Sequence, residues 1–271
     1  MALEDRVRPL TAGFVVAVLL AFSIFAVAQQ TTPAPAPNGQ DLQALDTVKA
    51  ALSALTGPSA VPASLVASGT YTRWPEGAPS VSFPIQVKVL GTTSVRWDSS
   101  EPTGSVTTIV NGLSGSVQTP SVSRALAIGE TFGRGVEIFP ALLITKWMGT
   151  TGLGMKWIGS ETLNSQSVNH TTVLPPATAS PNAIETQPKC EFYTDPQTNR
   201  PVRVRVYQHP TDRRASTLLD IDFSDYQTVS GLMFPMTVSF STGGQTIATI
   251  QFQSIAPNAS VSASEFIGSL P

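Results

Sequence analysis

The residues that could bind a metal ion are few and widely separated in this sequence. His170 and His209 are its two histidines, and Cys190 is its single cysteine. Zinc sites take Cys and His ligands at short local spacings, and these three residues share no such spacing. We therefore expect no metal and no cofactor, and interpret the three residues as surface or strand-packing positions.

Three aspartates, Asp220, Asp222 and Asp225, are the best candidates for acid–base chemistry. Such catalysis needs one carboxyl of a pair to be desolvated, so that its pKa shifts. Asp220 and Asp222 alternate with apolar residues, which places them on the polar face of a strand. Arg203 and Arg205 of the preceding strand can lie opposite them there, and cross-strand ion pairing then explains both aspartates without catalysis.

Two glycine-rich stretches lack the context of a catalytic or phosphate-binding loop. Gly112-Leu-Ser-Gly-Ser116 is not a Gly-x-Ser-x-Gly elbow, and it falls at a predicted hairpin turn. Gly149-Thr-Thr-Gly-Leu-Gly154 has no Gly-Lys-Ser/Thr and no strand–loop–helix pattern. We therefore expect that the protein has no enzymatic activity. An exported hydrolase is the alternative, and it would need His170 or His209 beside a serine and a carboxylate in one cleft.

Charge is sparse in this chain of 271 residues. Charged residues make up 13% of it, and the net charge is -2. Nucleic-acid binding calls for a clustered basic surface, so that class of partner is excluded. With 20 glycines and 22 prolines the composition indicates many short strands joined by turns. One cysteine cannot form an internal disulfide, so the fold must depend on its apolar core.

The N-terminus has the features of an export signal. Arg6 and Arg8 precede the apolar run Thr11–Ala28, which ends in the small-x-small sequence Ala26-Val-Ala28. That pattern predicts a signal peptide over residues 1–28, cleaved after Ala28, and hence a periplasmic protein. The alternative is an uncleaved inner-membrane anchor, because Thr11–Ala28 is just long enough to span a bilayer.

A linker and a helix are expected next. Residues 29–40 alternate proline with alanine, which favours an extended linker. A helix should then begin at Asp41 as its N-cap and stop at Gly57-Pro58. Its apolar face must lie against a sheet, and it opens a single domain over residues 41–271. The apolar residues at helical spacing are Leu42, Leu45, Val48, Leu52 and Leu55.

Strands dominate the rest of the chain. Residues 81–89 alternate apolar and polar side chains, and Pro84 indicates an edge or a bulge there. The middle of the chain lacks strict alternation, and we predict one short helix over 121–128 and a second over 136–148 that starts near Pro140. Residues 175–189 read as a long, mobile insertion. A turn at Asn111-Gly112 should be followed by a strand that returns to Gln118. The other strands are expected at 94–98, 105–110, 156–163, 166–174, 190–194, 202–208, 219–223, 232–240 and 246–255. The fold class is therefore α+β, an antiparallel meander with two or three helices.

One strand, residues 232–240, is unusually rich in large apolar side chains. Its alternate positions all point to one face of an extended segment. That face is either ordinary core or the lining of a cavity. The residues are Leu232, Phe234, Met236, Val238 and Phe240.

Several motifs follow the export signal and the amphipathic helix. Together, and in this order, they resemble the sequences of the periplasmic lipoprotein-carrier superfamily. This is the LolA/LolB-like group with LppX and RseB, and more narrowly the motifs look like those of its outer-membrane lipoprotein-sorting relatives. The resemblance covers residues 41–267. The motifs are Ser68-Gly-Thr-Tyr71, Phe139-Pro-Ala-Leu-Leu143, Gly159-Ser-Glu-Thr-Leu163, Phe192-Tyr-Thr-Asp-Pro-Gln-Thr198, Tyr226-Gln-Thr-Val-Ser-Gly-Leu-Met-Phe-Pro235 and Ile255-Ala-Pro-Asn-Ala-Ser-Val-Ser-Ala-Ser-Glu-Phe266.

The resemblance implies a strongly curved antiparallel sheet, an unclosed half-barrel, with two or three helices over its concave face and an apolar cavity between. It further implies a monomer that binds a lipid or lipoprotein acyl chain, and inner- and outer-membrane transport partners for delivery to the outer membrane. The alternative is a structural or sensor module of the same fold that acts through protein–protein contacts. Free volume inside the sheet distinguishes the two. The expected cavity residues are Phe83, Ile85, Val87, Trp97, Leu142, Leu143, Trp147, Leu232, Phe234, Met236, Val238 and Phe240.

Overall fold

The computed structural model describes residues 40–112, 114–131, 133–174, 176, 189–208 and 217–268. The predicted signal peptide, most of the linker, most of the 175–189 insertion and His209 lie outside these ranges. Within them, no helix combines the length and the apolarity needed to cross a bilayer.

The described residues form one antiparallel sheet of thirteen strands, with a few helices. The strands are β1 (Ser64–Arg73), β2 (Val81–Leu90), β3 (Ser94–Glu101), β4 (Gly104–Asn111), β5 (Ser114–Gln118), β6 (Ser123–Ala125), β7 (Gly154–Leu163), β8 (Gln166–Leu174), β9 (Cys190–Thr194), β10 (Pro201–Gln208), β11 (Thr217–Val229), β12 (Leu232–Thr242) and β13 (Gln245–Pro257). The helices are α1 (Leu42–Thr56), α2 (Ile128–Thr131), α3 (Pro140–Gly149) and the 3-10 turns η1 (Val136–Ile138) and η3 (Ala263–Phe266).

The strand order shows how the sheet stays open. It runs β6-β5-β4-β3-β2-β1-β13-β12-β11-β10-β9-β8-β7, so β6 and β7 are its two edges. The expected single meander is therefore two meanders, β1–β6 and β7–β13, joined where the first strand pairs with the last. The α+β half-barrel is confirmed.

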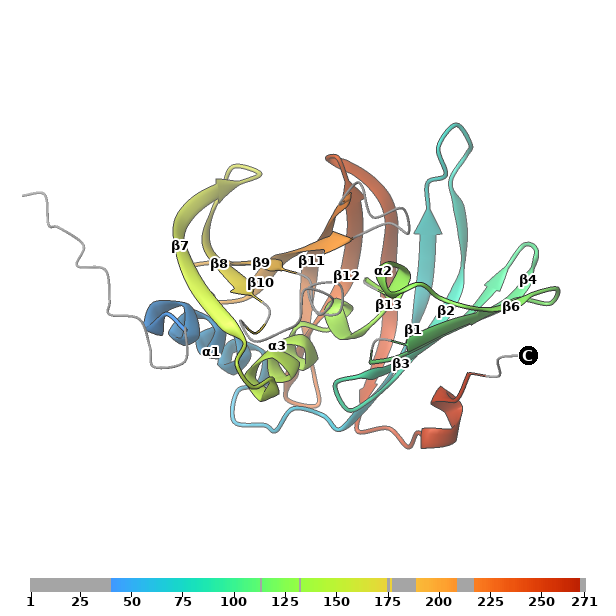
Figure 1. Ribbon diagram of the computed structural model, residues 1–271, viewed down its shortest axis with the longest axis horizontal. Coiled ribbons are helices and arrows are strands. Elements are labelled where there is room, and N and C mark those ends of the chain that lie inside the picture. The colour runs from blue at the N-terminus through green and yellow to red at the C-terminus, as the bar shows by residue number, and fades with distance from the viewer. Residues whose placement is uncertain are drawn as a thin grey trace, which may run out of the picture. The chain divides into compact units, whose positions relative to one another are not determined.

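This order determines the position of α2 and α3. Strands β6 and β7 follow one another in the chain but lie at opposite edges of the sheet. The segment that joins them carries α2, η1 and α3, and in Figure 1 it runs through the hollow of the curved sheet. The connection between the two meanders thus also covers the concave face.

Helix α1 forms where its signals predict. The Asp41 side chain accepts hydrogen bonds from the backbone N–H groups of Gln43 at 2.8 Å and Ala44 at 3.4 Å, and Gly57 ends the helix with a φ of 55°. The helix contacts α3, β7, β8 and β12. Leu42, expected on the apolar face, is instead 48% exposed. The buried face consists of Ala44, Val48, Ala51, Leu55 and Thr56.

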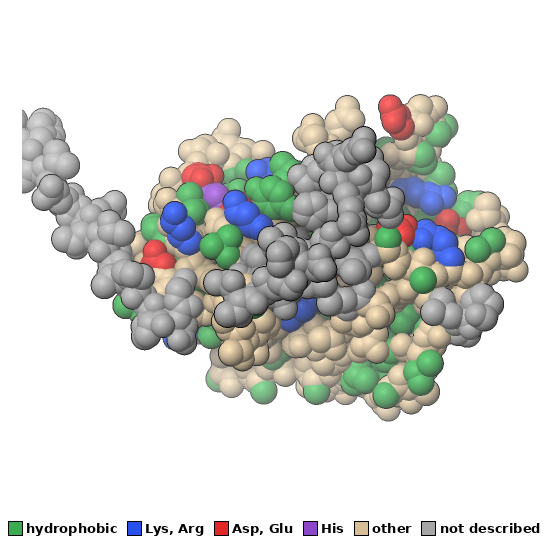
Figure 2. Space-filling view, in the orientation of Figure 1, with side chains coloured by type: hydrophobic (Ala, Val, Ile, Leu, Met, Phe, Trp, Pro, Cys, Tyr) green, Lys and Arg blue, Asp and Glu red, His purple; other side chains and the backbone are tan. Residues whose placement is uncertain are grey.

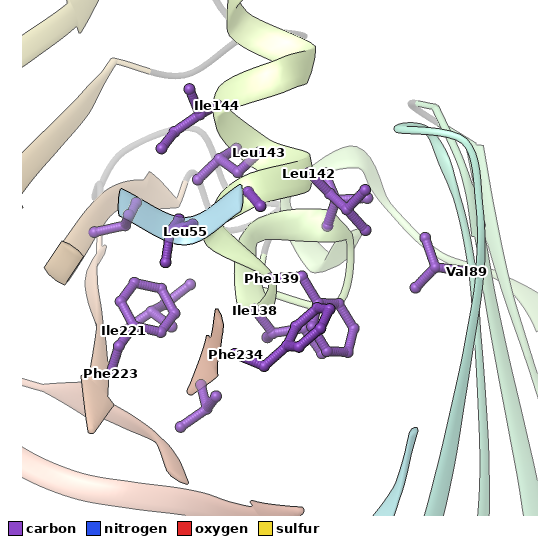
Figure 3. Packing of buried hydrophobic residues seen from close by; sticks show 14 of the residues in the cluster. Leu55, Val89, Ile138, Phe139, Leu142, Leu143, Ile144, Ile221, Phe223 and Phe234 are labelled. Atoms are coloured by element: carbon purple, nitrogen blue, oxygen red, sulfur yellow. The ribbon is translucent and has the colours of Figure 1, made fainter. Parts of the chain in front are cut away.

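Helix α3 and the 3-10 turn before it fill the middle of the core. Pro140 begins the helix, as expected. Figure 3 shows the side chains of this segment, including Phe139 and Leu142, between Ile221 on one side and Val89 on the other. The Phe139 ring stacks on Phe252 with centroids 5.5 Å apart. Side chains from both meanders therefore pack on one shared plug.

Two local expectations were wrong or incomplete. Residues 121–128 do not form a helix, because Ser123–Ala125 is the edge strand β6, paired with β5. Pairing with a neighbouring strand outweighs a weak local helical pattern. Pro84 lies in an interior strand rather than an edge strand or a bulge. It sits one residue beyond Ile85, where the ladder to β3 ends, so no β3 partner requires its missing N–H.

Candidate functional site

His170 and Cys190 lie on opposite faces of the sheet. In the β8–β9 register, His170 pairs with Tyr193, whereas Cys190 pairs with Val173. Side chains alternate along a strand, so the two groups cannot bind one metal ion. Cys190 is buried on the concave side, where burial raises the pKa of its thiol to about 12. No group of three or more metal-binding side chains occurs in the described ranges.

His170 is the centre of a polar cluster on the outer face of β7–β10. Its Nδ1 lies 2.6 Å from Glu161 Oε1 and its Nε2 lies 2.8 Å from Glu191 Oε2. A carboxylate on each ring nitrogen favours the doubly protonated ring. Burial lowers the pKa of His170, but the hydrogen bonds that its ring donates to Glu191 and Glu161 outweigh this effect and raise the pKa above its usual 6.5.

The Glu191 carboxylate is held in its charged form by the same cluster. Burial raises the pKa of Glu191, but hydrogen bonds from His170, Lys189 and Thr172 outweigh it and lower the pKa to about 2. The Thr172 hydroxyl donates at 2.6 Å and Lys189 Nζ lies at 2.5 Å. Every partner of Glu191 thus stabilises its charge, which makes it a structural carboxylate rather than a general base.

Two of the three candidate acid–base aspartates, Asp220 and Asp222, are ion-paired as expected. Arg203 donates to Asp222 at 2.6 and 2.9 Å, and Arg205 donates to Asp220 at 2.5 and 2.9 Å. Asp225 accepts a hydrogen bond from the Thr237 hydroxyl at 2.6 Å. These two-point pairs hold β10 to β11 across the outer face.

The concave face contains a cavity of about 410 Å³ that is partly open to solvent. Its floor is formed by apolar and aromatic side chains from both meanders. Phe83, Ile85 and Trp97 come from the first meander, and Phe240 and Ala248 come from the second. The volume falls within the range of small-molecule sites, about 300–1,000 Å³. This arrangement suits a long apolar group.

The mouth of this cavity is charged. Arg73, Arg124 and Arg134 line it together with Glu101 and the ring of Tyr71. Figure 2 shows blue and red side chains gathered beside green ones on the side of the molecule that carries strands β1–β6. The Arg73 guanidinium carbon lies 5.6 Å from the centre of the Phe83 ring, where the charged mouth meets the apolar floor.

Two other hollows are less suited to an apolar ligand. A cavity of about 60 Å³ lies beneath α3, with Glu137, Lys146 and Cys190 among its lining. A larger one of about 490 Å³ lies on the outer face around Gly69, and most of its lining is polar. The first is too small for an acyl chain and the second offers little apolar surface.

The structure places the twelve expected cavity residues in three groups. Phe83, Ile85, Trp97 and Phe240 line the 410 Å³ cavity, and Leu143 and Trp147 line the small one under α3. The other six line neither and are buried in the shared core: Val87, Leu142, Leu232, Phe234, Met236 and Val238. Four of the five apolar residues of β12 therefore pack as ordinary core, and only Phe240 reaches the cavity.

Sequence reasoning missed the mouth of the cavity and part of its floor. Tyr71 could have been found, because β1 alternates Leu65, Ala67, Gly69 and Tyr71 on one face. Arg124 and Arg134 could not, because they reach the site only through the path of the chain after β5. Ala248 has a small side chain, and nothing in the sequence distinguishes it as a cavity residue.

No protein-family model and no curated protein matches the chain. Solved structures do match it. A LolA superfamily protein from Nitrosomonas europaea has a TM-score of 0.56 at 12% identity, over 83% of this chain and 97% of its own. A DUF1329 family protein from Desulfovibrio piger gives 0.54 at 12%, over 83% and 97%. A domain assigned to outer membrane lipoprotein sorting in Vibrio parahaemolyticus gives 0.52 at 11%, over 83% and 96%. The chain therefore has a LolA-like fold, as its motifs suggested.

Proposed function

We propose that this is an exported lipid-binding protein that holds an acyl chain in the 410 Å³ cavity and takes part in lipid or lipoprotein transport to the outer membrane. The observation that carries the proposal is the cavity itself, with Phe83, Trp97 and Phe240 on its floor. Burying an acyl chain gains about 0.8 kcal/mol per methylene, so an apolar cavity suffices for binding. No covalent chemistry is required, and we expect no enzymatic activity.

The LolA-like fold supports this assignment. Two of the matching structures are described as a LolA superfamily protein and as a lipoprotein-sorting domain. The segment between β6 and β7 would act as the cover of the cavity, because it joins the two sheet edges across the concave face. Uptake and release of a chain would require α2 or α3 to move.

One observation favours a second candidate, a structural or sensor module without a lipid. Much of the concave face is filled by the protein's own side chains, among them Phe139, Leu142 and Phe234. A module of this kind would act through protein contacts and would leave the 410 Å³ cavity empty.

Native mass spectrometry of the full chain, purified gently from a bacterial host, distinguishes the two. We expect a stoichiometric lipid or fatty acid on the wild type. Ala248→Phe fills the cavity with a ring and should abolish that adduct, because Ala248 is a small buried residue in its lining. Ala256→Phe adds the same ring at an exposed position of the same strand and should keep it. A bare protein mass that stays bare after incubation with lipid would favour the second candidate.

A further inference from the structure

The charges at the cavity mouth do not balance within the described residues. Arg124 makes a two-point pair with Glu130, with both distances 2.9 Å. Arg73 lies 3.2 Å from Glu101. Arg134 is exposed, and no carboxylate in the described ranges pairs with its guanidinium. Arg134 therefore leaves one positive charge at the entrance of an apolar cavity.

An unused hydrogen-bond donor lies at the same place. Arg73 Nε is shielded from solvent and has no hydrogen-bond partner among the described residues. A buried donor without an acceptor costs free energy. The Arg73 side chain as a whole is 43% exposed, so the rest of this side chain is accessible to a ligand. Tyr71 belongs to the same lining, and its hydroxyl lies within the electrostatic reach of Arg73 and Arg134.

We propose that Arg73, Arg134 and Tyr71 form a subsite for an anionic headgroup, a carboxylate or a phosphate, of the amphiphile whose chain fills the cavity. The inference rests on the proposed acyl-chain function and adds the charge class of the ligand. A guanidinium presents paired N–H donors that match the oxygens of both groups. Phe83 lies directly beneath Arg73, so the headgroup would sit at the mouth and the chain would continue onto the apolar floor.

Brominated fatty acids provide a direct test, because bromine quenches tryptophan fluorescence at short range and Trp97 lines the cavity. The probes are 9,10-dibromostearic acid and its methyl ester, which share a chain and differ in headgroup charge. We expect the acid to bind about tenfold more tightly, as one or two charge-assisted hydrogen bonds would give. Trp97→Phe should remove most of the quenching by both probes.

Arginine variants identify the groups responsible. Arg73→Gln with Arg134→Gln should bring the affinity for the acid to within about twofold of that for the ester. Arg200→Gln removes one positive charge from the β9–β10 turn, outside the cavity lining, and should preserve the tenfold preference. Hexadecyl phosphate should compete with the acid, whereas inorganic phosphate at the same concentration should not, because it lacks the chain.

The outcomes separate this inference from the proposed function. Equal affinities of the wild type for acid and ester would overturn the headgroup subsite and leave acyl-chain binding intact. Binding of neither probe would overturn both. Competition by inorganic phosphate as strong as that by hexadecyl phosphate would make the arginines a site for free anions and overturn the lipid headgroup. The comparison of acid with ester uses the wild-type chain, so it stands even if the double variant does not fold.

Discussion

His170 shows how a single ionisable side chain on the outer face couples the stability of this fold to pH. Its two ring nitrogens contact two carboxylates, Glu161 and Glu191, and its ring stacks on Tyr193 with centroids 4.4 Å apart. The pKa of His170 is raised by these partners, and the pKa of Glu191 is lowered. A raised His pKa stabilises the folded state at low pH, whereas a lowered Glu pKa stabilises it at high pH.

The two shifts define a window of maximal stability. The contribution of His170 to the free energy of unfolding is complete below its ordinary pKa of 6.5. It is lost as the pH rises through the higher pKa that His170 has in the folded protein. The contribution of Glu191 is complete above its ordinary 4.5 and is lost as the pH falls toward about 2. The cluster should therefore stabilise the fold most between these ordinary values.

The variant His170→Gln tests this pH dependence of stability. We expect the variant to lose about 1–2 kcal/mol of unfolding free energy at pH 5.5, and less at pH 9, because the stabilisation by the charged ring is lost as the pH rises through its raised pKa. Urea unfolding at the two pH values measures the difference. His209→Gln, the other histidine, is the matched control. An equal loss at both pH values would contradict a charged His170.

The sequence predicted the Arg–Asp pairs between β10 and β11 but not the cluster around His170, and the reason is structural. Arg203 and Arg205 face Asp222 and Asp220 across two strands that follow one another in the chain, so alternation alone predicted the pairs. The His170 cluster draws on β7, β8 and β9. The register of β7 on β8 shifts between Trp157 and Gly159, and a shift of one residue moves every side chain to the other face.

The pairing of β1 with β13 has a steric constraint at Gly69. The register shifts between Ser68 and Gly69, and a Cβ at Gly69 would meet the backbone oxygen of Gln251 at 2.1 Å. Real Cβ atoms do not approach a backbone so closely, and here the obstacle is main chain rather than a flexible side chain. The two strands that join the meanders can approach as they do only with glycine at this position.

Gly69→Ala should therefore destabilise the protein by about 2 kcal/mol or more, because one of the two backbones must shift. Chemical denaturation gives the free energy. Gly149→Ala is the control, since a Cβ there meets nothing within 4 Å, and its effect should stay within about 0.5 kcal/mol. A Gly69→Ala protein as stable as the wild type would refute the close approach.

Elements with local signals were predictable and those that depend on distant partners were not. Helix α1 has a capping aspartate and a stop glycine, and the β7–β8 turn has Asn164 and Ser165, both with positive φ. Strand β6 is three residues long and exists only through its pairing with β5. No local pattern could show that β6 and β7, neighbours in sequence, lie at opposite edges of the sheet.

The described residues of both meanders share one apolar core. Val95 and Trp97 of the first meander belong to the same cluster of buried residues as Met155 and Phe192 of the second. The plug of η1 and α3 is part of that cluster and contacts both. Neither meander can separate from the plug without exposing apolar surface, so we expect both to unfold together, as one domain.

Two tryptophans at distant places in the sheet can test this cooperativity. Trp97 lies on β3 and Trp157 on β7, so a protein that retains only one of them reports on one meander. In each single-tryptophan protein, we expect the urea midpoint measured by tryptophan fluorescence to equal the midpoint measured by circular dichroism. A saturating acyl ligand should raise both midpoints together, because the cavity is lined by Trp97 from one meander and by Phe240 from the other. Separate midpoints, or a shift confined to Trp97, would instead show two domains with a ligand bound to one of them.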